Sequence, residues 1–206
     1  AIMTVLITVV AIVAVIGIFY LVISHNYNDT VVPVETSTNP YIVKIGDIMV
    51  LAHRSGGGIA LENTLKAFEN CVESSSFAIS IFEFDLHITK DGQLILLHDE
   101  NFDRTSNAAE YFGQEGVLPS DKTFDELKGL NMGESFVSDS GATPYKGLRG
   151  DDIPADLRVV RLTDVFDYLS AYGNYSFIIE IKNKDDLGRQ AADELYRILK
   201  QYNLLD

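Results

Sequence analysis

The chain of 206 residues has 16 basic and 30 acidic side chains, so its formal net charge is −14 at pH 7. This charge disfavours binding to nucleic acid, because contacts with a phosphate backbone need clustered lysine and arginine. It also disfavours docking on an anionic membrane surface by charge alone. The single cysteine, Cys71, excludes an intramolecular disulfide and a cysteine-rich metal site.

Residues 1–24 form a run without a charged side chain. A helix rising about 1.5 Å per residue would make this run roughly 36 Å long, enough to cross a hydrocarbon core of about 30 Å. A signal-peptide core or a buried helix is the alternative, but the basic start and small-residue cleavage site of a signal peptide are not clear here. We therefore predict a transmembrane helix over residues 1–24.

The residues that follow this predicted helix indicate its orientation in the membrane. No lysine or arginine precedes Lys44, so the flank lacks the positive charge of a cytoplasmic loop. We therefore predict a cell-membrane protein whose remaining chain lies outside the cytoplasm. Residues 25–46 contain two prolines and several Ser, Thr and Asn residues without a sustained apolar period, and they are predicted to form a linker.

After the linker, the sequence predicts four strands interspersed with helices. The strands are predicted over 47–53, 77–88, 93–99 and 175–183. The helices are predicted over 62–74, 123–130, 162–172 and 187–203. In the last helix, the apolar residues along one side are Ala191, Leu195, Ile198 and Leu199.

Strands buried on both faces and followed by helices indicate an α/β domain with a parallel sheet. A TIM (β/α)8 barrel needs eight strands and about 250 residues. We expect residues 47–206 to form about the first half of such a barrel, within a longer protein; a doubly wound sheet is the alternative. Half a barrel leaves strand edges and its interior uncovered, so we expect little activity from these residues alone.

Carboxylates lie within two predicted strands, where a core would be apolar. Glu83 and Asp85 are two residues apart and therefore point to the same face of a strand, with the apolar neighbours pointing to the other. Glu180 and Lys182 repeat this spacing on the fourth strand. Three carboxylates without a cysteine partner suit a hard divalent cation, Mg²⁺ or Ca²⁺; a solvated acidic edge is the alternative.

Two histidines end predicted strands. His53 follows the first strand and His98 the third, and barrel enzymes place their working residues at the carboxyl ends of strands. Since imidazole exchanges protons near neutral pH, the pair indicates general acid–base chemistry, with a structural role as the alternative. Arg54 either binds phosphate or forms a surface ion pair. His87, on the face of the two carboxylates of its strand, either contacts substrate or fills a polar rim.

In order and spacing, these residues resemble the motifs of the glycerophosphodiester phosphodiesterase family. The matching segments are His53-Arg54, Glu62-Asn63-Thr64, Glu83-x-Asp85, Thr89-Lys90-Asp91-Gly92, His98-Asp99, Arg104-Thr105 and Glu180-Ile181-Lys182. The resemblance covers residues 47–183. The chain departs from the family pattern at Ser55, where the family has glycine, and at Leu61, where it has proline. Both positions lie in the first loop, so the local turn is expected to differ while the catalytic side chains remain.

The resemblance implies a TIM barrel with a small insertion after the third strand, at about residues 104–160. It implies metal-dependent hydrolysis of glycerophosphodiesters to glycerol 3-phosphate and an alcohol, with His53 and His98 as the general acid–base pair. The implied ligands of Mg²⁺ or Ca²⁺ are Glu83, Asp85 and Glu180. Arg54 and Lys182 are implied to bind phosphate oxygens, and Glu62 to be a ligand or an orienter of its neighbours.

Two alternatives to this activity stay open at the level of sequence. The first is a phospholipase that acts on membrane lysophospholipids, which the predicted membrane helix favours. The second is a non-catalytic, membrane-anchored module that binds phosphodiesters. The presence of both His53 and His98 argues against the second alternative, because binding alone does not need two imidazoles.

Overall fold

The computed structural model describes residues 13–18, 49–58 and 60–205, and the chain divides into two units, residues 1–48 and 49–206. In the first unit, residues 13–18 are helical. The rest of the predicted membrane span and the whole predicted linker lie outside the described residues. Among the helices that the structure describes, none is both long enough and apolar enough to cross a membrane.

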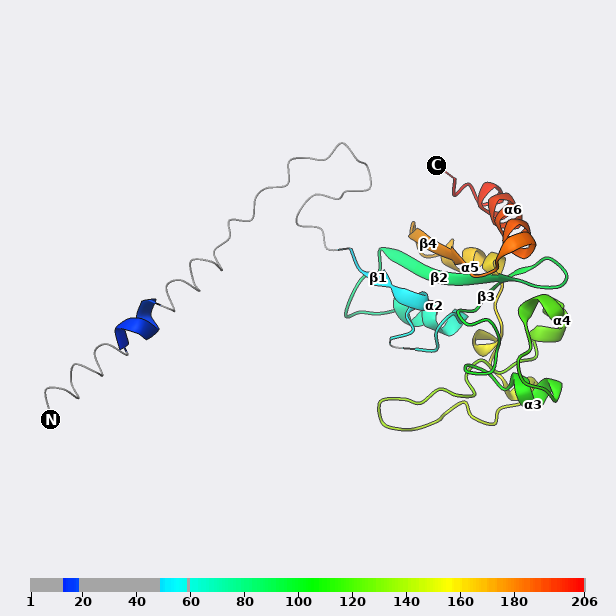
Figure 1. The fold of residues 1–206 in the computed structure, drawn as a ribbon, viewed down its shortest axis with the longest axis horizontal. Helices are drawn as coiled ribbons and strands as arrows, with labels where there is room; N and C mark the ends of the chain where they lie inside the picture. The colour runs from blue at the N-terminus through cyan, green and yellow to red at the C-terminus, as the bar shows by residue number, and fades with distance from the viewer. Residues whose placement is uncertain (1–12, 19–48, 59, 206) are drawn as a thin grey trace, which may run out of the picture. The chain divides into compact units, whose positions relative to one another are not determined.

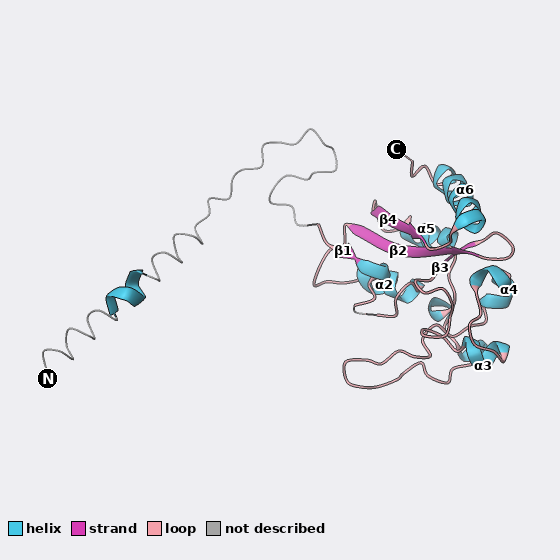
Figure 2. Cartoon of the chain, in the orientation of Figure 1, coloured by secondary structure: helices cyan, strands magenta, loops and turns pink. Residues whose placement is uncertain are grey.

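Residues 49–206 are built around a four-stranded sheet (Figures 1 and 2). The strands are β1 (Leu51–Ala52), β2 (Ile81–Ile88), β3 (Leu94–Leu96) and β4 (Ser176–Ile181). β2 lies at the centre of the sheet and pairs with the three other strands. β4 is parallel to β2 along one of its edges. Along the other edge, β1 pairs in parallel and β3 pairs antiparallel. Strand β1 is shorter than the predicted run over 47–53, because only Leu51 and Ala52 pair with β2.

Helices follow the strands in the predicted order. The α-helices of this unit are α2 (Leu65–Val72), α3 (Ala108–Phe112), α4 (Phe124–Leu127), α5 (Leu162–Leu169) and α6 (Asp185–Gln201). Short 3₁₀ turns are η1 (His53–Ser55), η2 (Pro119–Asp121), η3 (Gly150–Asp152) and η4 (Ala155–Leu157). The predicted helices over 62–74, 123–130, 162–172 and 187–203 are confirmed as α2, α4, α5 and α6, with shorter bounds for the first three.

Strand β3 differs from the predicted arrangement, because it runs antiparallel to β2 rather than parallel. Only residues 89–93 separate the two strands, whereas a parallel connection needs a crossover of a dozen residues or more. The hydroxyl of Thr89 accepts a hydrogen bond from the Gln93 N–H at 2.9 Å, and Gly92 takes a left-handed φ of 80°. The segment is therefore a tight hairpin, and the parallel part of the sheet consists of β1, β2 and β4.

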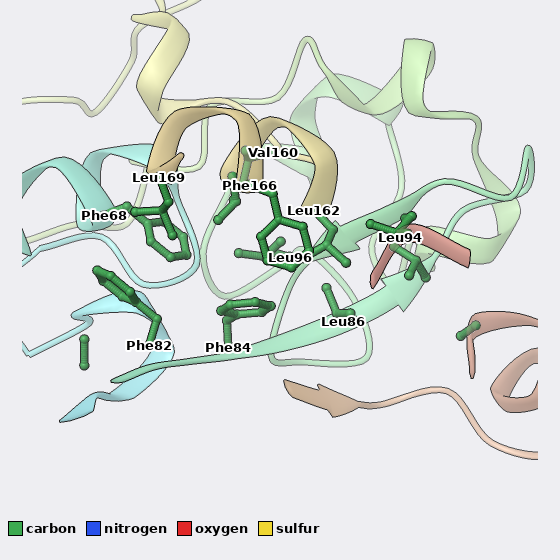
Figure 3. Packing of buried hydrophobic residues seen from close by; sticks show 14 of the residues in the cluster. Phe68, Phe82, Phe84, Leu86, Leu94, Leu96, Val160, Leu162, Phe166 and Leu169 are labelled. Carbon is green, nitrogen blue, oxygen red and sulfur yellow. The ribbon is translucent and has the colours of Figure 1, made fainter. Parts of the chain in front are cut away.

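One face of β2 forms the main core. Phe82, Phe84 and Leu86 alternate along the strand and are fully buried. Figure 3 shows these side chains facing Phe68 of α2 and Phe166 of α5. The rings of Phe68 and Phe82 lie 4.9 Å apart between centroids, a distance typical of favourable aromatic pairs. This face of the sheet is thus covered by helices.

Helix α6 packs against this core with its predicted apolar side. Ala191 and Ile198 are buried in the cluster, and Leu195 and Leu199 pack against it in part. Since residues three, four and seven apart share a helix face, the apolar spacing alone places all four toward the sheet. The predicted apolar side of this helix is confirmed.

The opposite face of the sheet carries the acidic residues and is more open. Along β4, Phe177, Ile179 and Ile181 are half-buried, whereas Ile178 is 50% exposed. Leu51 of β1 is 40% exposed. In a closed eight-stranded barrel, this face of each strand points to the interior.

A second hydrophobic core joins β3 to the predicted insertion. Leu94 and Leu96 of β3 point into the main core, whereas Ile95 and the following Leu97 point into the second. The second cluster also contains Phe102, Ala108, Val117, Leu127, Leu130, Met132 and Val159. Strand β3 therefore anchors the inserted segment to the sheet, although much of that segment is loop (Figure 2).

Replacement of Phe84 by alanine should reduce the free energy of unfolding by about 3–5 kcal/mol, because the buried ring leaves a cavity between β2 and its helices. Urea unfolding followed by circular dichroism measures this loss. Tyr196→Ala, on the solvent side of α6 with 58% exposure, is the matched aromatic control and should cost far less. Equal losses in the two variants would contradict the packing described for β2.

Candidate active site

Three carboxylates meet on the open face of the parallel strands. Glu83 and Asp85 lie two apart on β2, and the β2–β4 register pairs Asp85 with Glu180. One carboxylate oxygen from each residue lies within 4.8 Å of the other two. Alternation along β2 and the register with β4 are therefore sufficient to bring these three predicted residues together.

Each of these carboxylates has a different set of neighbours. Asp85 is 1% exposed and accepts a hydrogen bond from Asn63 Nδ2 at 3.0 Å. Lys182 Nζ lies 3.0 Å from Asp85 Oδ1 and 2.9 Å from Glu180 Oε1. Burial opposes the charged form of Lys182, but its ion pairs with Glu180 and Asp85 outweigh burial and raise its pKa. Glu83 Oε2 accepts the backbone N–H of Arg54 at 2.7 Å.

The donor set of this cluster fits a hard divalent cation. Among the described residues, Lys182 is the one ammonium group paired with this cluster, through Asp85 and Glu180, so the three carboxylates keep an excess of negative charge. All of its ligand atoms are oxygens, which is the preference of Mg²⁺ and Ca²⁺. A divalent cation between the carboxylates would relieve the repulsion of like charges at this short range.

His98 reaches this region through the hairpin rather than through the end of a parallel strand. The residue before it, Leu97, donates its N–H to the carbonyl oxygen of Asp85 at 3.0 Å. Strand β3 thus returns the chain to the part of β2 that carries the acidic cluster. The prediction that His98 ends a parallel strand is wrong, because β3 runs antiparallel to β2, although His98 does lie beside β2.

His98 belongs to a closed ring of five side chains, here called the His98 ring: His98, Asp99, Arg104, Glu62 and Arg54. The imidazole Nδ1 lies 2.8 Å from Asp99 Oδ1, and Nε2 lies 2.9 Å from Nη2 of Arg54. Arg104 donates from Nε to Asp99 Oδ2 at 2.5 Å and from Nη2 to Glu62 Oε1 at 2.6 Å. Arg54 closes the ring by donating from Nη1 to both oxygens of Glu62 at 3.3 Å.

The two carboxylates of the His98 ring are ionised at neutral pH. The hydrogen bond from Arg104 is the main cause that lowers the pKa of Asp99 to about 2, with a smaller contribution from His98. Burial alone would raise the pKa of Glu62, but hydrogen bonds and charges of Arg104 and Arg54 outweigh it and lower the pKa. The ring therefore contains two guanidinium cations balanced by two carboxylate anions.

The other two histidines of the domain differ strongly in exposure. The side chain of His53 in η1 is 70% exposed, and its Nε2 lies 3.9 Å from Glu83 Oε2. His87 is only 4% exposed, and burial lowers its pKa. Its position fits the filling of a polar interior rather than contact with substrate.

The loop after β1 is held in an uncommon conformation. Arg54 and Ser55 both have left-handed backbone angles, with φ of 50° and 63°. The Ser55 side chain is buried, and its hydroxyl has no hydrogen-bond partner among the described residues. A Cβ on Gly57 would lie 2.9 Å from the Cβ of Glu62, so glycine allows this loop to pack against Glu62. These contacts place the backbone N–H of Arg54 on Glu83 and its guanidinium group in the His98 ring.

The second departure from the family motif has a packing explanation. Leu61 is 6% exposed and packs with Ile153 and Leu157 of the inserted segment. The motif continues into α2, where the Thr64 hydroxyl caps the helix by accepting the Ala67 N–H at 3.3 Å. Leu61 thus ties the loop that carries Glu62 to the insertion.

A cavity of about 270 Å³ opens beside the His98 ring. Glu62 and Arg104 line its polar side, and Leu61, Met132 and Phe136 line its apolar side. The inserted segment contributes Met132 and Phe136, so this cavity lies between the first loop and the insertion.

The structure places the predicted site residues in two adjoining groups. Glu83, Asp85, Glu180 and Lys182 form the acidic cluster with His53 at its margin, and Arg54, Glu62 and His98 belong to the ring. Asp99 and Arg104 were quoted only as members of motifs, and their part in the ring was missed. Their positions one and six residues after His98 were the available signal.

The sequence is similar to known proteins over most of the described domain. The model of the Glycerophosphoryl diester phosphodiesterase family matches residues 53–204. A glycerophosphodiester phosphodiesterase of Caldanaerobacter subterraneus is 32% identical over 161 residues, which are 75% of this chain and 54% of that protein. The human lysophospholipase D GDPD1 is 32% identical over 153 residues, covering 74% of this chain and 41% of that protein.

Solved structures show the same fold. A phosphodiesterase of Oleispira antarctica, in complex with the product sn-glycerol-3-phosphate, has a TM-score of 0.57 and 24% identity over 75% of this chain and 53% of that chain. A glycerophosphodiester phosphodiesterase of Agrobacterium tumefaciens has a TM-score of 0.54 and 22% identity over 77% of this chain and 55% of that chain. The fold is thus TIM-barrel-like α/β with a parallel sheet, as predicted. The chain spans about half the length of the first curated relatives it matches.

Replacement of Ser55 by glycine should raise the free energy of unfolding by about 1 kcal/mol. Glycine removes the left-handed strain and the unpartnered buried hydroxyl, and these gains exceed its greater unfolded-state entropy. Urea unfolding measures the change. Ser75→Gly, at an exposed position outside the left-handed region, is the control and should lower stability slightly. A loss in Ser55→Gly would contradict the loop conformation described.

Addition of Ca²⁺ or Mg²⁺ should raise the thermal unfolding temperature, and Glu180→Gln should remove most of this shift. Loss of one carboxylate ligand should weaken cation affinity at least about 10-fold. Glu180 suits the test because its side chain is 57% exposed and contributes little to packing. Exposed Glu115→Gln is the control with the same chemical change. An equal shift in wild type and Glu180→Gln would rule out the cluster as the cation site.

Proposed function

Since the chain belongs to the glycerophosphoryl diester phosphodiesterase family, we propose that the whole protein hydrolyses glycerophosphodiesters to glycerol 3-phosphate and an alcohol. The observation that carries this proposal is the meeting, on neighbouring strand ends and loops, of a carboxylate cluster, two histidines and two cationic side chains. The named activity of the Caldanaerobacter relative and the product complex of the Oleispira phosphodiesterase support the same reaction class.

Capture of an anionic diester by this chain requires local positive charge, because the net charge of −14 repels it. Arg54 and Lys182 are the candidate phosphate-binding residues. Glu83, Asp85 and Glu180 would hold Mg²⁺ or Ca²⁺. When bound, such a cation stabilises negative charge on phosphoryl oxygens and lowers the pKa of a coordinated hydroxyl or water.

His53 and His98 are the proposed general acid–base pair. One imidazole removes the proton of the attacking oxygen, and the other protonates the leaving alcohol. The two rings differ in a way that suits two roles: His53 is 70% exposed at the margin of the acidic cluster, whereas His98 has hydrogen-bond partners at both nitrogens.

Glu62 is proposed to orient its neighbours rather than to bind the cation. Both of its carboxylate oxygens accept hydrogen bonds from the guanidinium groups of Arg54 and Arg104. It is absent from the group of carboxylates that gathers around Asp85 among the described residues. Its position therefore favours the second of the two roles that the family resemblance implies.

Lysophospholipid hydrolysis is the second candidate function. The human relative at 32% identity carries the name lysophospholipase D, and residues 1–24 are predicted to anchor the protein in a membrane. We propose a cell-membrane location with the catalytic domain outside the cytoplasm, for which the uncharged run and the absence of lysine and arginine between it and Lys44 are the support. A non-catalytic binding module is disfavoured by the two histidines.

The full-length protein should release choline from glycerophosphocholine in the presence of Mg²⁺ or Ca²⁺, and EDTA should stop the release reversibly. His53→Ala should reduce kcat at least about 100-fold, because one proton-transfer group is lost. The cation-induced rise in unfolding temperature should persist in this variant. Asp125→Asn, at an exposed ion pair on α4, is the control with unchanged activity.

A parallel assay with lysophosphatidylcholine separates the two candidate functions. Choline release from the soluble diester alone would eliminate the lysophospholipase candidate, and release from the lipid alone would eliminate the first. An unchanged rate in His53→Ala would end the assignment of His53 as a proton-transfer group.

A further inference from the structure

We propose that Asp99 and Arg104 are positioning residues of the reaction: Asp99 fixes the proton of His98 on Nδ1, and Arg104 fixes Asp99. This inference rests on the proposed hydrolytic function and deepens it. It concerns two side chains to which the sequence argument gave no role in the site.

The donors around His98 determine where its proton lies. A guanidinium group can donate hydrogen bonds but cannot accept them. Nη2 of Arg54 lies 2.9 Å from His98 Nε2, so Nε2 must be the acceptor and carries no proton. The single proton of the neutral ring is then on Nδ1, which donates to Asp99 Oδ1 at 2.8 Å. Nε2 therefore has a lone pair that can accept a proton.

Arg104 restrains the carboxylate that sets this arrangement. It donates from Nε to Asp99 Oδ2 at 2.5 Å and from Nη2 to Asp99 Oδ1 at 3.0 Å, a two-point contact that fixes the plane of the carboxylate. Its other contacts, to Glu62 at 2.6 and 3.1 Å, fix Arg104 itself. Asp99 consequently cannot rotate away from His98 without breaking several hydrogen bonds.

Stability alone does not account for this arrangement. The side chain of Arg104 is 49% exposed and that of Asp99 is 29% exposed. Ion pairs at such exposure contribute little to folding, because water and salt screen them. The guanidinium group of Arg104 is nevertheless held by Asp99 on one side and by Glu62 on the other. The chemical consequence of these contacts is the orientation of His98 and Arg54.

The same ring explains how substrate would free His98. Arg54 covers Nε2 while it is bound to Glu62 and His98. A phosphate group offers the guanidinium a stronger bidentate partner than a neutral imidazole does. Capture of phosphate by Arg54 therefore uncovers Nε2, and from that point Asp99 alone keeps the proton on Nδ1.

The position of the proton can be measured without any assay of activity. In ¹⁵N-histidine-labelled full-length protein, nitrogen NMR distinguishes a protonated from an unprotonated ring nitrogen, and His98→Gln identifies the His98 signals among the four histidines. Wild type should show neutral His98 protonated on Nδ1, with and without inorganic phosphate. Asp99→Ala with saturating inorganic phosphate should lose this preference. A wild-type proton on Nε2, or an unchanged pattern in Asp99→Ala with phosphate, would overturn the proposal.

Kinetics give a second, independent measurement. Asp99→Ala should lower kcat at least about 100-fold, with KM for glycerophosphocholine changed less than about 3-fold, because Asp99 is not placed to touch phosphate. Arg104→Lys keeps the positive charge but removes the planar group that donates two hydrogen bonds to Asp99, so kcat should fall about 10-fold. Arg197→Lys in an exposed pair on α6, and Asp125→Ala on α4, are controls that should keep wild-type kcat.

The two proposals fail in distinguishable ways. A protein with the Nδ1 proton that hydrolyses neither substrate would refute the proposed function and leave the assignment of the His98 proton intact. An active protein in which Asp99→Ala and Arg104→Lys retain wild-type kcat would refute the positioning role and leave the function intact.

Discussion

The alternation of side chains along β2 is the constraint on which the rest of the site depends. Phe82, Phe84 and Leu86 are fully buried against helices, so the register of the strand cannot shift by one residue without moving these rings into the open face. The intervening Glu83 and Asp85 are consequently forced onto that open face. The hydrophobic core thus fixes the position of two carboxylates that would otherwise repel each other.

The electrostatic repulsion between these carboxylates is offset by partners from the loops that follow β1 and from the end of β4. Asp85, at 1% exposure, is stabilised by the ammonium of Lys182 and the amide of Asn63. Glu83 accepts a backbone N–H from the loop after β1. Removal of a partner from a buried charge is strongly destabilising. The residues that stabilise the cluster within the fold are therefore the same residues that set the positions of its carboxylates.

Much of this arrangement could be predicted from the sequence because it follows from local periodicity. The two-residue spacing of Glu83 and Asp85 gives a shared face, and the apolar spacing of α6 gives its buried side. The direction of β3 was predicted wrongly, because residues 89–93 between β2 and β3 are too few for a parallel crossover. The His98 ring was missed because it joins Glu62 to Arg104, 42 residues apart, through side-chain hydrogen bonds that no periodicity encodes.

Arg54 links the two parts of the site, and its backbone conformation makes this possible. The left-handed φ of 50° costs roughly 1–2 kcal/mol for a residue with a Cβ. It is offset by the N–H bond to Glu83 at 2.7 Å and by the guanidinium contacts to Glu62 and His98. The main chain of one residue thus belongs to the acidic cluster while its side chain belongs to the ring. Because the long side chain can leave His98 while the N–H remains on Glu83, the proposed capture of phosphate by Arg54 would uncover the imidazole without disturbing the carboxylates beside it.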